Sequence, residues 1–159
     1  MELNPYASHL GQQDARAVLA STPGLIHQAV CQLTPQQIEA PIAPGKWSPR
    51  QIVAHLADCE MVFSFRLRQT LAEPDHIVQP FDQDKWSQRY AVYPLPEALE
   101  LYRAARAWNL KLIGGLHSAD FARPVTHPER GTMTFMTILE TMAGHDLNHL
   151  VQLQKLIPA

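Results

Sequence analysis

The sequence predicts an all-α protein, a four-helix bundle, formed by a single domain that covers residues 1–159. Four long segments carry apolar residues at spacings of three and four, which is the helical period. No segment shows a convincing alternation of apolar and polar residues, the pattern that is typical of a strand. A length of 159 residues suits one domain, and 46% hydrophobic residues are enough to form its core.

The first two helical segments are delimited by prolines. We expect the first over residues 8–33, broken at residues 21–23 because Pro23 lacks the amide hydrogen that continues a helix. A short turn follows at residues 34–35. The second helix begins at Ser48, an N-cap followed by Pro49 at the first helical position and Gln51 in a capping box, and extends to about Leu71. Its apolar stripe comprises Ile52, Leu56, Cys59, Phe63 and Leu67.

The third helix begins near Pro96 and ends near Gly114, and the fourth follows Gly131 and extends to about Ile157. The third stripe comprises Ala98, Leu101, Ala105, Trp108, Leu112 and Leu116. The fourth stripe comprises Phe135, Ile138, Met142, Leu153 and Leu156. A four-helix bundle buries four such stripes against one another.

Two connections between these helices are long, about 22 residues over 73–94 and about 15 residues over 117–131, compared with the usual ~2–8. The first therefore predicts a long crossover between the second and third helices. It contains aromatic and acidic residues, which either cover a pocket or only attach the loop to the bundle. These residues are Phe81, Asp82, Asp84, Trp86, Tyr90 and Tyr93.

Composition excludes some classes of partner. The chain has 13 Lys and Arg, 15 Asp and Glu, a formal net charge of −2 and no basic block, so we expect no nucleic-acid partner. It shows no secretory leader and no apolar stretch of membrane-spanning length, so we expect a cytoplasmic location and no membrane partner. Both cysteines, Cys31 and Cys59, lie within apolar helical patterns, and we expect buried free thiols.

The clearest chemical feature is the pair His145 and His149. Residues four apart on a helix lie on one face, so both imidazoles can reach one metal ion. Both histidines continue the fourth apolar stripe and point into the bundle, where a polar group needs a partner. A structural pair hydrogen-bonded to buried groups is the alternative. The motif differs from the His-Glu-x-x-His helix of zinc proteases, because Asp146 is shorter than glutamate and no ligand-type residue follows His149.

A third ligand must therefore come from upstream, and His55 is the best placed of the remaining histidines. It lies seven residues into the second helix, and His149 lies about eight residues from the end of the fourth. The two imidazoles reach the same depth only if these helices are antiparallel; in a parallel arrangement they miss by roughly 8–14 Å. The sequence therefore predicts antiparallel packing of the second and fourth helices.

Several motifs together resemble those of one family, the DinB-like superfamily, and in particular its YfiT-type branch. They are the segments 44–49 (Pro-Gly-Lys-Trp-Ser-Pro), 52–58, 81–82, 127–131 (His-Pro-Glu-Arg-Gly) and 145–149, with Trp86 and Tyr90. This resemblance spans almost the whole chain. It implies a bundle of up-down-down-up topology and a three-histidine metal site on His55, His145 and His149.

The resemblance also implies a class of chemistry. Members of the family are described as metal-dependent hydrolases, and some are similar to S-transferases that join a low-molecular-weight thiol to an electrophile. A divalent ion held by three neutral imidazoles can activate either water or a thiol. Zinc and nickel are the expected metals, and iron also suits imidazole ligands. We expect a small-molecule substrate and, for the transferase, a thiol cosubstrate.

Five further residues are candidates for a supporting role. Asp82 in the long loop is the candidate base. Asp146 and Asp58 either orient a ligating imidazole or face solvent. Arg66 either meets an anionic substrate or extends its stem along apolar surface. Cys59 is expected to be a core thiol rather than a nucleophile.

Three classes of function remain open from the sequence alone. A metal-dependent transferase or hydrolase is the first, and a metal-binding protein without turnover, such as a stress-response accessory, is the second. A purely structural helical domain is the third. A homodimer is a further expectation.

Overall fold

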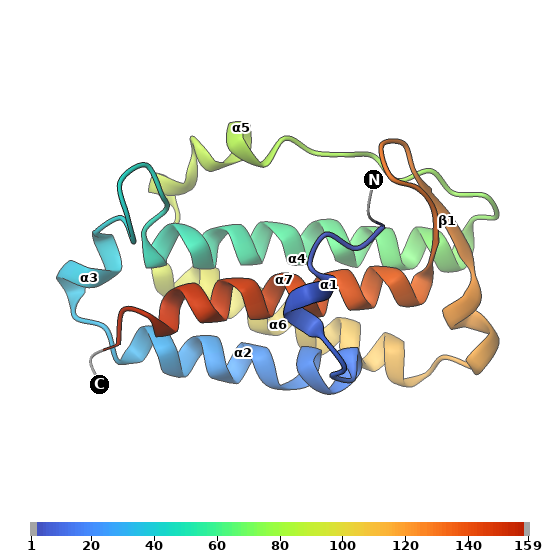
Figure 1. Cartoon of the computed structure of the whole chain (residues 1–159), viewed down its shortest axis with the longest axis horizontal. Helices are drawn as coiled ribbons and strands as arrows, with labels where there is room; N and C mark the ends of the chain where they lie inside the picture. The colour runs from blue at the N-terminus through green and yellow to red at the C-terminus, as the bar shows by residue number, and fades with distance from the viewer. Residues whose placement is uncertain (1–2, 158–159) are drawn as a thin grey trace.

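The computed structural model describes residues 3–157 and contains a bundle of four long helices (Figure 1). These are α2 (Ala15–Cys31), α4 (Pro49–Ala72), α6 (Leu95–Gly114) and α7 (Phe135–Gln154). Along the bundle axis α2 and α7 run in one direction and α4 and α6 in the other, so the topology is up-down-down-up and α4 is antiparallel to α7 (Figure 1). The predicted four-helix bundle is confirmed.

Short helices lie before the first long helix and in the connections between the long ones. They are α1 (Ala7–Leu10), α3 (Pro35–Glu39), α5 (Gln83–Ser87) and the 3₁₀ turns η1 (Tyr90–Val92) and η2 (Ser118–Ala122). Figure 1 shows the segment with α1 crossing over α7. Gly144 permits this crossing, because a Cβ atom there would collide with the Tyr6 backbone.

The first helical segment breaks at a different place from the predicted one. The break lies between α1 and α2, where Gly11 has a φ of 58° and Asp14 caps α2 through the amide of Ala17. Helix α2 continues through Pro23. A residue-23 amide would normally donate to the Leu19 carbonyl; here that carbonyl accepts from Arg106 Nη1 at 3.1 Å instead. A partner from another helix thus replaces the bond that proline removes.

The expectation of no strand is wrong for one small hairpin. Strands β1 (Pro124–His127) and β2 (Gly131–Thr134) pair antiparallel, and Gly131 has a φ of 94° at the turn. Strands of four residues are too short for alternation to be visible in the sequence. Because β2 takes the residues after Gly131, α7 begins only at Phe135, with Thr134 as its N-cap.

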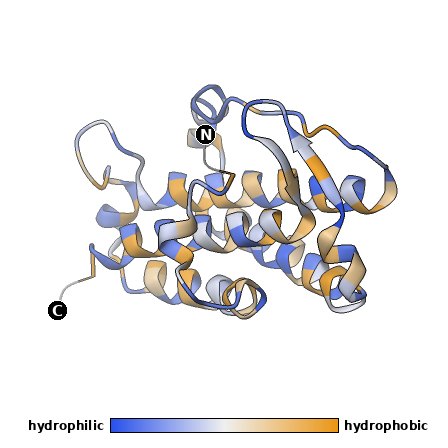
Figure 2. Ribbon diagram, turned by 45° about the vertical axis from the view of Figure 1, so that its right-hand side comes forward, coloured by the Kyte–Doolittle hydropathy of each residue, from blue (hydrophilic) through white to orange (hydrophobic). Residues whose placement is uncertain are grey.

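The core consists of two apolar clusters, one toward each end of the bundle. On α7 the first contains the segment from Phe135 to Ala143, and the second contains Leu150 and Leu153. Figure 2 shows hydrophobic and hydrophilic residues alternating along each long helix, as expected when one face is buried. The segment of α7 between the two clusters carries His145, Asp146 and His149, all buried. No described helix is both long and apolar enough to span a membrane.

Candidate metal centre

Three buried histidines meet between α4 and α7. His55 lies on α4, and His145 and His149 lie one turn apart on α7. The Nε2 atom of His145 lies 3.0 Å from Nε2 of His55 and 3.2 Å from Nε2 of His149. All three side chains are at least 95% buried. The structure therefore brings together the three histidines that the sequence singled out.

Hydrogen bonds on the far side of two rings determine where their protons lie. The Nδ1 atom of His149 lies 3.1 Å from Gln152 Oε1, which can only accept, so Nδ1 carries the proton. The Nδ1 atom of His55 lies 3.3 Å from the Tyr90 hydroxyl, and that hydroxyl interacts in turn with Asp58. A hydroxyl that donates to Asp58 accepts from His55. Both rings then direct an unprotonated Nε2 toward His145.

Burial keeps these histidines neutral. It lowers the pKa of His55 to about 3, and repulsion from His149 acts in the same direction. Burial also holds the pKa of His145 well below its usual range, and it lowers the pKa of His149 against the opposing effect of Gln152. Neutral imidazoles at pH 7 are the form that binds metal ions.

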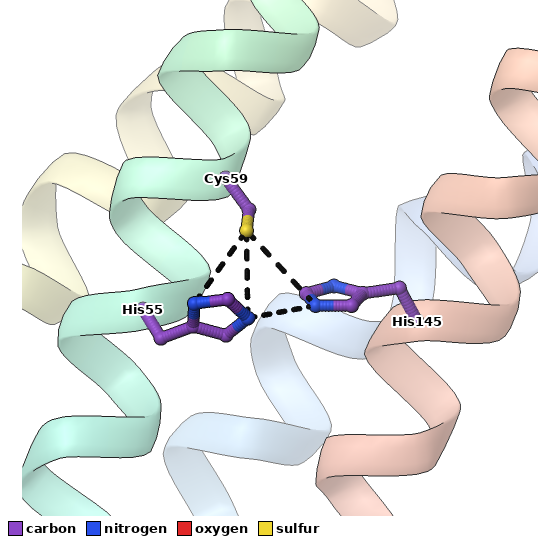
Figure 3. Close-up of side chains that lie close together, drawn as sticks. All are labelled: His55, Cys59 and His145. Atoms are coloured by element: carbon purple, nitrogen blue, oxygen red, sulfur yellow. Dashed lines mark hydrogen bonds between the residues drawn. The ribbon is translucent and has the colours of Figure 1, made fainter. Parts of the chain in front are cut away.

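Cys59 lies one helical turn beyond His55 on α4 and points into the same space (Figure 3). Its Sγ atom is 3.5 Å from His55 Nε2 and 4.0 Å from His145 Nε2, so His55, Cys59 and His145 could hold a metal ion. The same sulfur is 3.7 Å from His55 Nδ1. Because it is nearly equidistant from both ring nitrogens, it packs against the ring instead of lying in line with the Nε2 lone pair. As expected, Cys59 is buried; Cys31, contrary to expectation, is exposed.

The spacing of the ring nitrogens suits a metal ion. Ligand atoms about 2.0–2.1 Å from a tetrahedral ion lie about 3.3 Å from one another. The distances from His145 Nε2 to the other two Nε2 atoms, 3.0 Å to His55 and 3.2 Å to His149, are close to that value. The donor set and its protonation therefore fit a divalent metal ion.

Aromatic side chains from the N-terminal segment, from the loop before α4 and from α4 itself surround the histidines. The Trp47 ring lies 4.6 Å from the His55 ring and 6.4 Å from the His149 ring between centroids. Tyr6, which precedes α1, contacts the His145 ring edge-on at 5.1 Å, and Phe63 lies 6.4 Å from it. No pattern in the sequence pointed to Tyr6, because its contact depends on how the N-terminal segment crosses α7.

Asp146 has neither of the roles considered from the sequence. It is 2% exposed, and its Oδ2 atom accepts from Arg106 at 2.7 Å, Thr22 at 2.6 Å and Tyr102 at 2.8 Å. Arg106 also pairs with Glu60 at 2.7 Å, so one buried guanidinium joins two carboxylates. This network holds α7 against α2, α4 and α6 at the residue that follows His145.

Of the two remaining acidic candidates, Asp58 is linked to the histidines through Tyr90, whereas Asp82 is not in contact with them. Asp58 is buried and acts through Tyr90; burial raises its pKa, and the hydrogen bond to Tyr90 opposes that rise. Asp82 caps α5, and its side chain is 50% exposed and pairs with Lys85. It lines a groove of about 620 Å³ together with Phe81 and Trp86. The structure does not bring Asp82 into contact with the histidines.

An open pocket of about 570 Å³ reaches the histidine site at His149. Trp47 and Gln152 line it near the histidine, and Lys46, Lys155 and Asp84 add charged groups. Asp84 therefore faces the pocket, whereas Asp82, two residues earlier, faces the neighbouring groove. This arrangement gives a small molecule access to the edge of the centre.

Comparisons with known proteins agree with this fold. The DinB superfamily sequence model matches residues 19–153. A protein of Oceanobacillus iheyensis named "Putative metal-dependent hydrolase" is 28% identical over 135 residues, covering 84% of this chain and 78% of the relative. YfiT of Bacillus subtilis is 28% identical over 143 residues, covering 87% of this chain and 80% of YfiT.

The solved structure of YfiT is described as a probable metal-dependent hydrolase with an unusual four-helix bundle topology. It matches this structure with a TM-score of 0.84 at 27% identity, covering 89% of this chain and 83% of that one. The resemblance seen in the sequence motifs is thus confirmed by the family match and by the fold. The chain belongs to the DinB superfamily.

Proposed function

We propose that the protein is a metal-dependent enzyme that uses His55, His145 and His149 as ligands and transfers a low-molecular-weight thiol to an electrophilic small molecule. One observation supports this most strongly: the Nε2 atoms of two neutral imidazoles, His55 and His149, both lie within 3.2 Å of His145 Nε2, and an open pocket reaches them at His149. A purely structural histidine cluster would not need that pocket. Zinc or nickel is the proposed metal, with iron as a further candidate.

We choose His149 over Cys59 as the third ligand because of the direction in which the donor atom of each side chain points. Gln152 holds the proton of His149 on Nδ1 and leaves its Nε2 atom facing His145. The Cys59 sulfur lies beside the His55 ring, and burial raises the pKa of its thiol. A ligand set of three neutral histidines adds no negative charge, which favours an incoming thiolate as an anionic ligand.

When bound, the metal would lower the pKa of a thiol or of water and so supply the nucleophile. The residues of the chain prepare its surroundings. Trp47 shields two of the imidazoles from water, and Lys46 and Lys155 attract an anionic molecule into the pocket. Conjugation then forms a bond from sulfur to the electrophilic carbon as the bond from that carbon to its leaving group breaks. The thiol proton passes to a base, and the leaving group departs with the electron pair of the broken bond.

The base is proposed to lie on the loop that carries α5. Asp82 is the candidate from the sequence, and Asp84 is the candidate that lines the pocket beside His149. The variants Asp82→Asn and Asp84→Asn separate them. The variant that lacks the base should lose about 100-fold or more in kcat, whereas the other should keep near wild-type activity.

Hydrolysis of a small ester or amide is the second candidate function. The relatives named above as metal-dependent hydrolases favour it, and the pocket at His149 admits water as readily as a thiol. The two functions share the same three histidines and differ only in the nucleophile. A non-catalytic, metal-binding role in the stress response would show neither activity.

A cobalt-substituted sample tests these alternatives. The protein is purified without a nickel column, stripped with a chelator and loaded with Co²⁺, and thiols are then added in turn. We expect a sulfur-to-cobalt charge-transfer band with the right thiol, conjugation of an electrophile, and loss of both in His149→Ala. Ester or amide hydrolysis without any thiol band would overturn the transferase and establish the hydrolase.

We also propose that the protein forms a homodimer. Several large apolar side chains on α4 and α6 are exposed, among them Phe65 at 60% and Trp108 at 64%. Such side chains are enriched at interfaces between subunits. Light scattering of the purified protein at several concentrations measures the oligomeric state.

A further inference from the structure

A small cavity of about 30 Å³ lies beyond Phe63 from the histidine site and is lined by two arginines and a histidine. Arg66 of α4, His127 at the end of β1 and Arg130 in the hairpin turn all face it. No acidic residue is among the side chains that line it within residues 3–157. Two arginines thus share one cavity without a carboxylate between them.

The Arg66 guanidinium is only partly satisfied. Its Nη2 group donates to the Gln79 carbonyl at 2.9 Å, but its Nε group is buried and has no hydrogen-bond partner in the structure. Buried polar groups without a partner are rare in folded proteins because they are costly. The buried Nε group of Arg66 is therefore a donor available to a ligand.

His127 adds a second hydrogen-bond donor, and its contacts determine which ring nitrogen carries the proton. It is 9% exposed, and its Nδ1 atom accepts a hydrogen bond from the Glu129 amide at 3.2 Å. A neutral imidazole that accepts at Nδ1 carries its proton on Nε2. Burial lowers the pKa of His127, and the charges of Arg130 and Arg66 lower it further, so the ring is neutral and donates through Nε2.

The electrostatics of the cavity favour an anion. Burial lowers the pKa of Arg66, and Arg130 acts in the same direction, which shows that the two positive charges repel each other. An anion between them would replace repulsion with attraction and would accept from both guanidinium groups. The cavity has room for two or three atoms of water size, about the size of a carboxylate group.

We propose that Arg66, His127 and Arg130 form a carboxylate-binding subsite that anchors the acid end of the molecule reacting at the metal. The proposal rests on the proposed function, because it assigns this molecule to the same reaction. The carboxylate belongs either to the thiol cosubstrate or to the electrophile, and the experiments below distinguish the two.

The position of the subsite relative to the histidines supports this role. Phe63 lines the cavity, and its ring also faces His145 at 6.4 Å, so one side chain separates the two sites. His55, Cys59, Phe63 and Arg66 follow one another at helical spacing on one face of α4. Arg66 lies about 16 Å beyond His55 along the helix axis. A molecule that reaches past Phe63 and has its carboxylate roughly 16 Å from its reactive atom would contact both sites.

The first experiment tests the subsite without metal or thiol. Acetate and its uncharged analogue acetamide are added to chelator-treated protein at constant ionic strength, and thermal unfolding is recorded. Acetate alone should raise the Tm of the wild type, because it binds only the folded state. Arg66→Gln and Arg130→Gln should each remove the shift, and Arg103→Gln, an exposed arginine on α6, should keep it. An equal acetate effect in all four proteins would overturn the proposal.

The second experiment identifies the source of the carboxylate. Glutathione and its ethyl ester serve as the thiol pair, and an electrophile with a carboxylate is compared with its amide. Wild-type protein should prefer the acid in one pair by about 10-fold to 100-fold, as charged hydrogen bonds of this kind do. Arg66→Gln should remove that preference and leave the uncharged analogue unaffected. No preference in either pair would overturn the role in the reaction. If no thiol binds the metal, the proposed function fails, but the acetate shift still reports on the subsite.

Discussion

Two pairs of histidine and cysteine have the same spacing but different surroundings. His27 and Cys31 are four residues apart on α2, and His55 and Cys59 are four apart on α4. The sulfur to ring-nitrogen distances are 3.8 Å for both nitrogens in the first pair and 3.7 and 3.5 Å in the second. Helical geometry alone therefore brings the side chains of such a pair together.

What differs is the contribution of a second helix. Cys31 is exposed and His27 half-buried, whereas His55 and Cys59 are buried and face His145. A contact made within one helix carries little information about function. Convergence of imidazoles from two antiparallel helices requires a particular tertiary arrangement, and that requirement is what makes the second pair part of a candidate site.

The largest expected effect comes from removing the anchor of α7. Asp146→Ala leaves Arg106 with one carboxylate and removes the acceptor of Thr22 and Tyr102. Breaking a buried ion pair in this way should cost about 3–5 kcal/mol of unfolding free energy. Urea unfolding measures it, with the exposed Asp84→Ala as control. A loss below about 1 kcal/mol would show that the network does not hold α7.

Two substitutions test the comparison directly: His145→Ala, at the histidine that faces the second pair, and His27→Ala, within the first pair. Two sets of ligands are possible, and they share His55 and His145; the third ligand is His149 in one set and Cys59 in the other. His145→Ala disrupts both sets and should lower metal affinity by more than about 100-fold. His27→Ala should change it by less than about twofold. Competition with a chromogenic chelator measures both. Equal effects would mean that the metal binds elsewhere.

Acidification should destabilise the metal-free protein through the buried histidines. Their pKa values are lowered in the folded state, to about 3 for His55, while the unfolded chain keeps values near ~6.5. Between these limits the unfolded state binds more protons, so stability falls as pH decreases below about 6.5. Each histidine contributes up to about 1.4 kcal/mol per pH unit. Urea unfolding at several pH values measures the slope, which His55→Gln should reduce; an unchanged slope would contradict the assignment.

The sequence predicted those features that depend on local patterns. Helical spacing and the capping box at Ser48 gave α4 its correct start and end, and matching depths brought His55 to the pair on α7. The spacing and the capping box are set by residues within a few turns of one another. The matching depths follow from counting residues along each helix. That is why the bundle and its three histidines could be predicted together.

The features that were missed depend on distant partners. Helix α2 continues through Pro23 because Arg106, 87 residues after Leu19, takes the freed carbonyl. Asp146 is held by Thr22 and Arg106, at separations of 124 and 40 residues. No periodicity within a segment reports such contacts, because they are made only when four helices have packed.

The smallest expected effect concerns the hydroxyl that orients His55. Tyr90→Phe keeps the ring against Trp47 but removes the acceptor of His55 Nδ1. The imidazole then loses the bond that directs its Nε2 atom toward His145, and metal affinity should fall by about 10-fold, as it does when such outer hydrogen bonds are removed. Tyr93→Phe, on an exposed ring three residues later, is the matched control and should have no effect. Chelator competition on both variants measures the difference. An unchanged affinity in Tyr90→Phe would show that packing against Trp47 alone holds the His55 ring in place.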